Sequence, residues 1–275
     1  TSYLNSLEDC REALIRFRRD LHRHPEPGWK EFYTTARLIA ALKDHGIPAK
    51  YGKEILHRDY LWGYPPQKEL DVCMERAVSQ GADAGIIKEM DGFTGAMAVI
   101  ETGNPGPVTA LRFDIDCNDV GEDMDPCRLP VKNGFSSENC GCMHACGHDT
   151  HAACLLVLAR ILSEHPELVK GTVKFIFQAA EEKLPGGAKA LCADHALDGV
   201  DMVFGMHSSS NHPLGTITLS HSSSSAAIGI YEVAIHGKGG HGSAPHNAKN
   251  PVPVACLLAS ALNQILAEKK APADT

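Results

Sequence analysis

The chain lacks the features that mark nucleic-acid-binding and membrane proteins. Basic residues are not in excess, because 26 Lys and Arg stand against 34 Asp and Glu for a net charge of −8. Nucleic acid binding needs a basic surface, so we expect no nucleic acid partner. No apolar run reaches membrane-spanning length and no signal-like segment opens the sequence. We therefore expect no membrane association and a cytoplasmic location.

Cysteine and histidine are plentiful, but their usual simple arrangements are missing. None of the ten cysteines forms a C-x-x-C pair, which argues against zinc fingers and thioredoxin-like redox motifs. No run of histidines is present, so the 15 histidines do not come from a tag. A hydrophobic content of 43% is that of an ordinary globular protein. The high histidine count is compatible with metal chemistry.

Apolar patterning predicts alternating strands and helices. The expected strands are 93–101, 108–113, 172–178 and 200–206, and the expected helices are 6–22, 32–45, 68–80, 151–164 and 186–196. This β-α-β alternation predicts an α/β fold with a mostly parallel sheet.

A change of composition divides the chain into two predicted domains. The Ser-rich stretch 220–225 favours a linker, with a strand at 231–236 and a helix at 251–267 beyond it. We expect domains at 1–219 and 220–275. The second is near the lower size limit for an independent core.

Three predicted strands end in side chains that bind divalent metals. Asp114 and Asp116 end the first, Glu181 and Glu182 follow the second, and His207 ends the third. Ligands in open α/β sheets bind at the carboxyl ends of the strands, so these segments are expected to meet. Alone, Asp114 and Asp116 also suit a capped turn, and a single His207 is more often structural.

A fourth segment places Cys146 and His148 two residues apart around Gly147. A tight loop of this kind can direct both side chains at one ion, and glycine permits close approach of the backbone. Asp149 could bridge two metals or orient a histidine. The simpler alternative is a loop cysteine followed by an aspartate that caps the next helix. Thiolate, imidazole and carboxylate together predict zinc or manganese.

The adjacent residues Glu181 and Glu182 suggest two different roles at one site. On an extended chain the two side chains point to opposite sides, so one could bind metal while the other meets the substrate water. A solvated charge pair is the alternative. Further along, the Gly-rich stretch 237–246 lacks the spacing of a phosphate loop. It is either a plain hairpin or a flexible edge that presents His241 to a substrate.

These motifs together resemble the dinuclear metallopeptidases of the aminoacylase and carboxypeptidase type. The resemblance is carried by Met-His-Ala-Cys146-Gly-His148-Asp149-x-His151, Phe-Gln-Ala-Ala-Glu181-Glu182, Phe-Gly-Met-His207 and Gly-Gly-His241-x-x-x-Pro-His246. It is nearest to the amidohydrolase branch, which includes auxin-conjugate and hippurate hydrolases. That branch also matches Arg-His-Pro-Glu26 with Trp29-x-Glu31.

The resemblance implies roles for individual residues. Cys146, His148, Glu182 and His207 would bind two divalent ions, Mn or Zn, and Glu181 would be the general base. In this branch Asp114 stands where relatives have a histidine, and Asp116 would support the site. The resemblance further implies a zinc-peptidase-like catalytic domain and a smaller α+β lid or dimerisation domain, whose His241 polarises the scissile carbonyl.

The same resemblance implies the substrate class and the partner. We expect hydrolysis of an N-acyl amino acid by a homodimer or a heterodimer with a related subunit. The insert at 53–90, followed by Gly92-Phe-Thr-Gly95, resembles members that cleave aminobenzoyl-glutamate. Members continue past position 275, where they complete the lid and supply one more His ligand. Alternatives are other N-acyl amino acids, or an incomplete, non-catalytic partner subunit that retains metal binding.

Overall fold

The computed structural model describes residues 2–219 and 231–269. The chain divides into two compact units, Thr1–Ser210 and Asn211–Thr275. The predicted linker at 220–225 lies outside the described residues.

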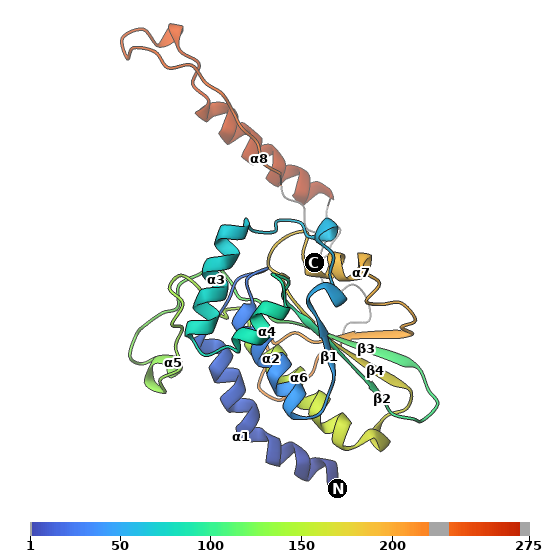
Figure 1. The fold of residues 1–275 in the computed structure, drawn as a ribbon. Coiled ribbons are helices and arrows are strands. Elements are labelled where there is room, and N and C mark those ends of the chain that lie inside the picture. The colour runs from blue at the N-terminus through green and yellow to red at the C-terminus, as the bar shows by residue number, and fades with distance from the viewer. Residues whose placement is uncertain (1, 220–230, 270–275) are drawn as a thin grey trace. The chain divides into compact units, whose positions relative to one another are not determined.

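The first unit is built on a five-stranded sheet with the strand order β1-β2-β4-β3-β5 (Figure 1). The strands are β1 (Ala49–Tyr51), β2 (Ala96–Glu101), β3 (Val108–Asp114), β4 (Thr172–Gln178) and β5 (Met202–Gly205). The pairs β3–β4 and β3–β5 are parallel, whereas β1–β2 and β2–β4 are antiparallel. The α/β class is confirmed, but the sheet is mixed rather than mostly parallel. The turn between β2 and β3 carries no helix, and the short strand β1 was not foreseen.

Helices surround this sheet. Those of the first unit are α1 (Ser2–Arg23), α2 (Phe32–Asp44), α3 (Gln67–Ser79), α4 (Ala84–Glu89), α5 (Leu129–Lys132), α6 (His148–Glu164) and α7 (Gly187–Ala193). Short 3-10 turns lie at Gly52–Glu54, Arg58–Tyr60, Pro166–Leu168 and Pro245–Asn247. The predicted helices are confirmed with shifted ends, and α6 begins three residues earlier than predicted. That shift places His148 and His151 on one helix.

Successive side chains of β4 pack alternately into two separate hydrophobic cores. Phe175 and Phe177 face a large core shared with α2 and α6, in which Leu38 and Leu155 are fully buried. Ile176 points to the opposite face and packs in a smaller core with residues of α7 and Trp29. Period-two alternation explains the division, because successive strand residues face opposite sides of a sheet. The sheet is thus covered on both faces at β4, whereas the edge strand β5 is exposed.

The longest element in the described part of the second unit is the helix α8 (Val252–Lys269). Residues 231–236 form no strand, so that prediction is wrong within the described residues. Their backbone finds no partner strand, and Val233 and Tyr231 are exposed. A single antiparallel bridge joins Lys238 and Lys249 around the Gly-rich stretch. The lid or dimerisation role of this unit stays a prediction.

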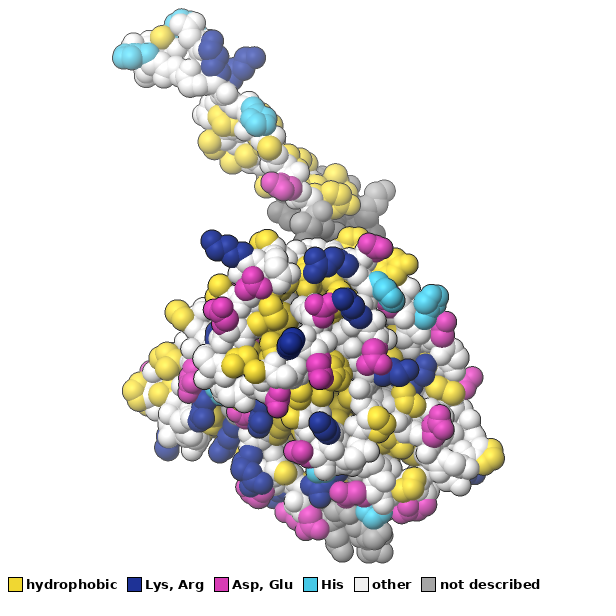
Figure 2. Space-filling model, viewed as in Figure 1, with side chains coloured by type: hydrophobic (Ala, Val, Ile, Leu, Met, Phe, Trp, Pro, Cys, Tyr) yellow, Lys and Arg dark blue, Asp and Glu magenta, His cyan; other side chains and the backbone are white. Residues whose placement is uncertain are grey.

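The charge distribution on the surface and the length of the helices are relevant to two expectations from the sequence, that the protein binds no nucleic acid and does not associate with a membrane. On the face of the first unit shown in Figure 2, basic and acidic side chains are interspersed. That face therefore carries no broad patch of one sign. Among the helices that the structure describes, none combines the length and apolar character needed to cross a membrane.

Candidate metal centre

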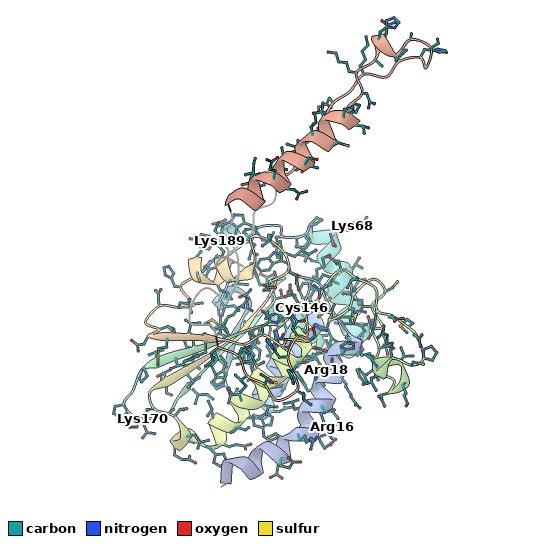
Figure 3. All side chains as sticks on the ribbon, turned by 180° about the vertical axis from the view of Figure 1, so that it is seen from behind. Arg16, Arg18, Lys68, Cys146, Lys170 and Lys189 are labelled. Atoms are coloured by element: carbon teal, nitrogen blue, oxygen red, sulfur yellow. The ribbon has the colours of Figure 1, made fainter. Side chains whose placement is uncertain are left out.

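Cys146, labelled in Figure 3, is half-buried and lies just before α6, whereas His148 is the first residue of α6 and is buried. Gly147 between them has φ +85°, and a Cβ at this position would lie 2.5 Å from the Ser208 hydroxyl oxygen. Only glycine suits both demands, since L side chains rarely adopt this backbone and no space is left for one. The left-handed residue turns the chain into the helix and brings the thiol and the imidazole to one side.

His207 reaches the same place from the end of β5. Its Nε2 atom lies 3.2 Å from Cys146 Sγ. The next residue, Ser208, donates its backbone N–H to His151 Nε2 at 2.8 Å. The sequence motifs assigned no role to His151, although its three-residue spacing from His148 on a helix puts both on one face. The two rings stack with centroids 5.1 Å apart.

The two glutamates follow β4 in a bend rather than an extended strand. Their side chains therefore do not diverge as predicted. One ligand atom each of His148, Glu181 and Glu182 lies within 4.8 Å of the others, and the same holds for Cys146, His148 and His207. Both carboxylates can consequently face a cation held by His148. The geometry alone does not separate a metal ligand from a general base.

Asp114 is the last residue of β3 and Asp116 follows it, and each contacts the Nδ1 atom of one histidine of α6. Asp114 contacts His151 Nδ1 at 2.5 Å and pairs with Arg112 at 3.2 Å. Asp116 accepts the Glu182 backbone N–H at 2.9 Å, and its backbone oxygen lies 3.0 Å from His148 Nδ1. For His148 this leaves Nε2 as an electron-pair donor, which is the form that binds metal, whereas His151 Nε2 accepts the Ser208 N–H.

Asp149 points elsewhere. Its carboxylate lies 2.7 Å from His22 Nδ1 and 2.9 Å from Arg18 Nε. It belongs to none of the described groups whose ligand atoms converge. The sequence raised three alternatives for Asp149: bridging two metals, orienting a histidine or capping the helix. The structure shows a contact with a histidine, His22 of α1, which is not one of the predicted ligands. The packing of α1 against α6 decides this contact, which no local pattern reveals.

The donor set fits a divalent cation. His148 Nε2 is buried and has no hydrogen-bond partner in the described structure. Burial and then the nearby Glu182 charge raise the pKa of Cys146 to about 12. Burial, Asp114 and Glu182 raise the pKa of Glu181 in the same way. Several acidic side chains thus lie close together with little positive charge nearby. A cation bound among them would neutralise part of their negative charge and lower the pKa values of Cys146 and Glu181.

His241 lies in the second unit, where its Nδ1 is 2.8 Å from the Ser243 hydroxyl. The ring is exposed. Its role toward a substrate stays a prediction.

Comparison with known families shows to which family the chain belongs. Residues 110–274 match the family described as Peptidase family M20/M25/M40. The chain belongs to this family. The match includes every residue predicted to bind metal or take part in catalysis.

Similar proteins of this family act on acylated amino acids, as their names state. The chain is 36% identical over 265 residues to a p-aminobenzoyl-glutamate hydrolase subunit of Escherichia coli (strain K12), and the match covers 96% of this chain and 60% of that protein. It is 35% identical over 254 residues to indole-3-acetyl-aspartic acid hydrolase of Enterobacter agglomerans, covering 92% of this chain and 58% of the relative.

Solved structures agree with the fold. An aminobenzoyl-glutamate utilization protein from Klebsiella pneumoniae matches with a TM-score of 0.63 and 30% identity, over 78% of this chain and 48% of that one. A dinuclear metal binding peptidase of the M20 family from Bacillus subtilis matches with a TM-score of 0.58 and 32% identity, over 78% and 47%. The chain therefore spans about half to three fifths of the length of these relatives.

Proposed function

We propose that this chain provides the metal-binding part of an amide hydrolase that cleaves N-acyl amino acids. The observation that supports the proposal is the convergence of Cys146, His148, Glu181, Glu182 and His207 from three elements onto one place. In this proposal Cys146, His148, Glu182 and His207 hold two divalent ions, zinc or manganese. Thiolate and imidazole favour zinc, while the carboxylates also accept manganese.

Glu181 is the proposed general base. Divalent ions bound here would polarise an amide carbonyl and make a nearby water more acidic. Glu181 would accept the proton of the attacking water and pass it to the leaving amine nitrogen. His241 would donate a hydrogen bond to the developing oxyanion.

Aminobenzoyl-glutamate is the substrate we propose, with aminobenzoate and glutamate as products. The support is the similarity to the p-aminobenzoyl-glutamate hydrolase of E. coli over most of this chain. Indole-acetyl-aspartate and N-acetylcysteine are the alternative substrates to be tested, because other relatives are named for their hydrolysis. A homodimer, or a heterodimer with a related subunit, is the assembly we propose for the active protein.

The test combines metal analysis with a substrate panel. The purified chain is loaded with zinc or manganese, and metal content is measured after removal of free ions. Hydrolysis of aminobenzoyl-glutamate, indole-acetyl-aspartate and N-acetylcysteine is then followed, with the E. coli relative as a positive control. We expect two ions per chain and release of aminobenzoate. Metal binding without turnover of any substrate, both in this chain and in a form extended to the length of the E. coli relative, would favour the non-catalytic partner subunit instead.

The Glu181→Gln variant tests whether Glu181 acts as the general base or as a metal ligand. We expect this variant to keep its metal content and to lose turnover by a factor of about 100 or more, as removal of a general base does. The matched control is Glu75→Gln, a change of the same chemistry at an exposed position of α3. Turnover retained in Glu181→Gln would move the base role to another residue.

A further inference from the structure

Glu31 is a fully buried carboxylate that has no role in the chemistry described above. It precedes α2, far in sequence from the metal-binding segments. One oxygen accepts the backbone N–H of Ala180 at 2.7 Å. The other accepts the hydroxyl of Thr94 at 2.7 Å. A single side chain thus connects the start of α2, the approach to β2 and the residue just before Glu181.

Ala180 has an unusual backbone that needs such support. Its φ is +53°, in the left-handed region that non-glycine residues adopt at a cost of about 1 kcal/mol. Its carbonyl accepts the Gly187 N–H at 2.8 Å, while its own N–H is satisfied by Glu31. Because this peptide is buried, loss of either partner would leave a backbone group unpaired. The left-handed residue turns the chain at the end of β4 and directs Glu181 and Glu182 toward His148.

Asp116 holds the other side of the same turn. Its Oδ2 accepts the Glu182 N–H at 2.9 Å, so one buried carboxylate lies before Glu181 and another after it. The two carboxylates are close enough that the charge of Asp116, after burial, raises the pKa of Glu31. No ion pair joins Glu31 to a Lys or Arg in the described part of the chain. A carboxylate buried without a countercharge is costly for stability, and an apolar residue would fill the space at lower cost.

We propose that Glu31 is a positioning residue for Glu181, acting through the Ala180 peptide. This inference rests on the proposed function, because it assigns Glu181 as the group being positioned. Glu31 fixes the left-handed peptide that aims the Glu181 side chain at the metal centre. Displacement of a catalytic group by about 1 Å costs on the order of 100-fold in rate.

The two hydrogen bonds that the Glu31 side chain accepts determine which substitutions test its role. Glu31→Ala removes both acceptors and leaves the Ala180 N–H unpaired. Glu31→Gln keeps one acceptor for Ala180, and its amide can donate to the Thr94 hydroxyl, so it is the conservative variant. Glu31→Asp keeps the carboxyl group but is one methylene too short to hold both partners. Glu26→Asp is the matched control, because Glu26 is also fully buried and accepts backbone N–H groups, those of Tyr33 and Thr34, outside the 180–182 turn.

The experiment measures kcat and KM for aminobenzoyl-glutamate in the metal-loaded protein, together with the absorption spectrum of the cobalt-substituted form. We expect Glu31→Ala to lower kcat about 100-fold and Glu31→Asp about 10-fold, with KM within twofold and cobalt content unchanged. The cobalt bands should shift in both, since the carboxylate beside the ion moves. Glu31→Gln should recover at least a third of the wild-type kcat. Glu26→Asp should lower the melting temperature and leave kcat and the spectrum unchanged.

Two results would overturn the inference. The first is a folded Glu31→Ala or Glu31→Asp with kcat within twofold of the wild type and an unshifted cobalt spectrum. The second is a fall in kcat for Glu26→Asp as large as that for Glu31→Asp, which would make the effect one of general stability. Should Glu31→Ala fail to fold, Glu31→Asp and Glu31→Gln carry the comparison. Failure of the proposed function is a different outcome, because the wild-type protein would then cleave no N-acyl amino acid.

Discussion

Cys146 Sγ and His207 Nε2 lie 3.2 Å apart although the two residues are separated by 61 positions in the chain. This contact joins the start of α6 to the end of β5 and closes the metal-binding cluster. We predict that Cys146→Ala and His207→Ala each lower the zinc content of the protein by about one ion per chain, since each removes a zinc ligand of the preferred type. Elemental analysis after dialysis measures this. Cys140→Ala, an exposed cysteine of the same loop, is the control and should retain the wild-type content. Equal metal content in all three variants would reject the cluster as a metal centre.

Glu26 caps the first turn of α2 from outside the helix. Its two carboxylate oxygens accept the Tyr33 and Thr34 N–H groups, each at 2.9 Å. Removal leaves two buried donors unpaired, so Glu26→Ala is predicted to lower the free energy of unfolding by about 2 kcal/mol or more. Urea unfolding measures the change. The exposed Glu12→Ala of α1 should stay within about 0.5 kcal/mol of the wild type. A difference no larger than that of Glu12→Ala would show that the cap is dispensable.

Gly187 begins α7 in a space with no room for a side chain. A Cβ there would lie 2.0 Å from the Ala179 carbonyl oxygen, a backbone atom that cannot rotate away. Gly187→Ala must therefore displace the peptide next to Ala180. We predict a loss of about 3 kcal/mol, in the range of severe overpacking. Thermal unfolding is the measurement. Gly121→Ala is the matched control, because nothing lies within 4 Å of its added methyl group. Similar melting temperatures for the two variants would contradict the structure at this turn.

Cys142 should be the most easily titrated thiol near the site. The neighbouring Cys117 thiol, the largest cause, lowers the pKa of Cys142 to about 7. Since the thiolate is the reactive form, its alkylation rate is predicted to rise with pH and reach half its maximum near pH 7. Mass spectrometry after brief iodoacetamide treatment measures the rate. In Cys117→Ala the midpoint should move up toward the ordinary thiol value, 9.0. An unchanged midpoint in that variant would remove Cys117 as the cause.

Apolar periodicity was sufficient to predict the strands β2 to β5 and the main helices, because these patterns are local. It could not predict the mixed sheet. The segment between β2 and β3 is a short turn, and the order β1-β2-β4-β3-β5 inserts β4 between them. Pairing of distant strands depends on the whole core, so two antiparallel pairs were missed. Short elements such as β1 and α4 give too few residues for a periodic signal.

The sequence by itself determined which side chains make up the candidate metal centre. The spacing of Cys146, Gly147 and His148 and the position of Glu181, Glu182 and His207 after apolar runs are local features, and strand ends must meet at one edge of a sheet. Only the tertiary structure decided how these groups are held. Asp149 turns to His22, both glutamates face His148, and Glu31 reaches the Ala180 peptide from 149 positions away. Such contacts arise from the packing of α1 against α6 and of α2 against the sheet, and buried polar groups find whatever partner that packing brings within reach.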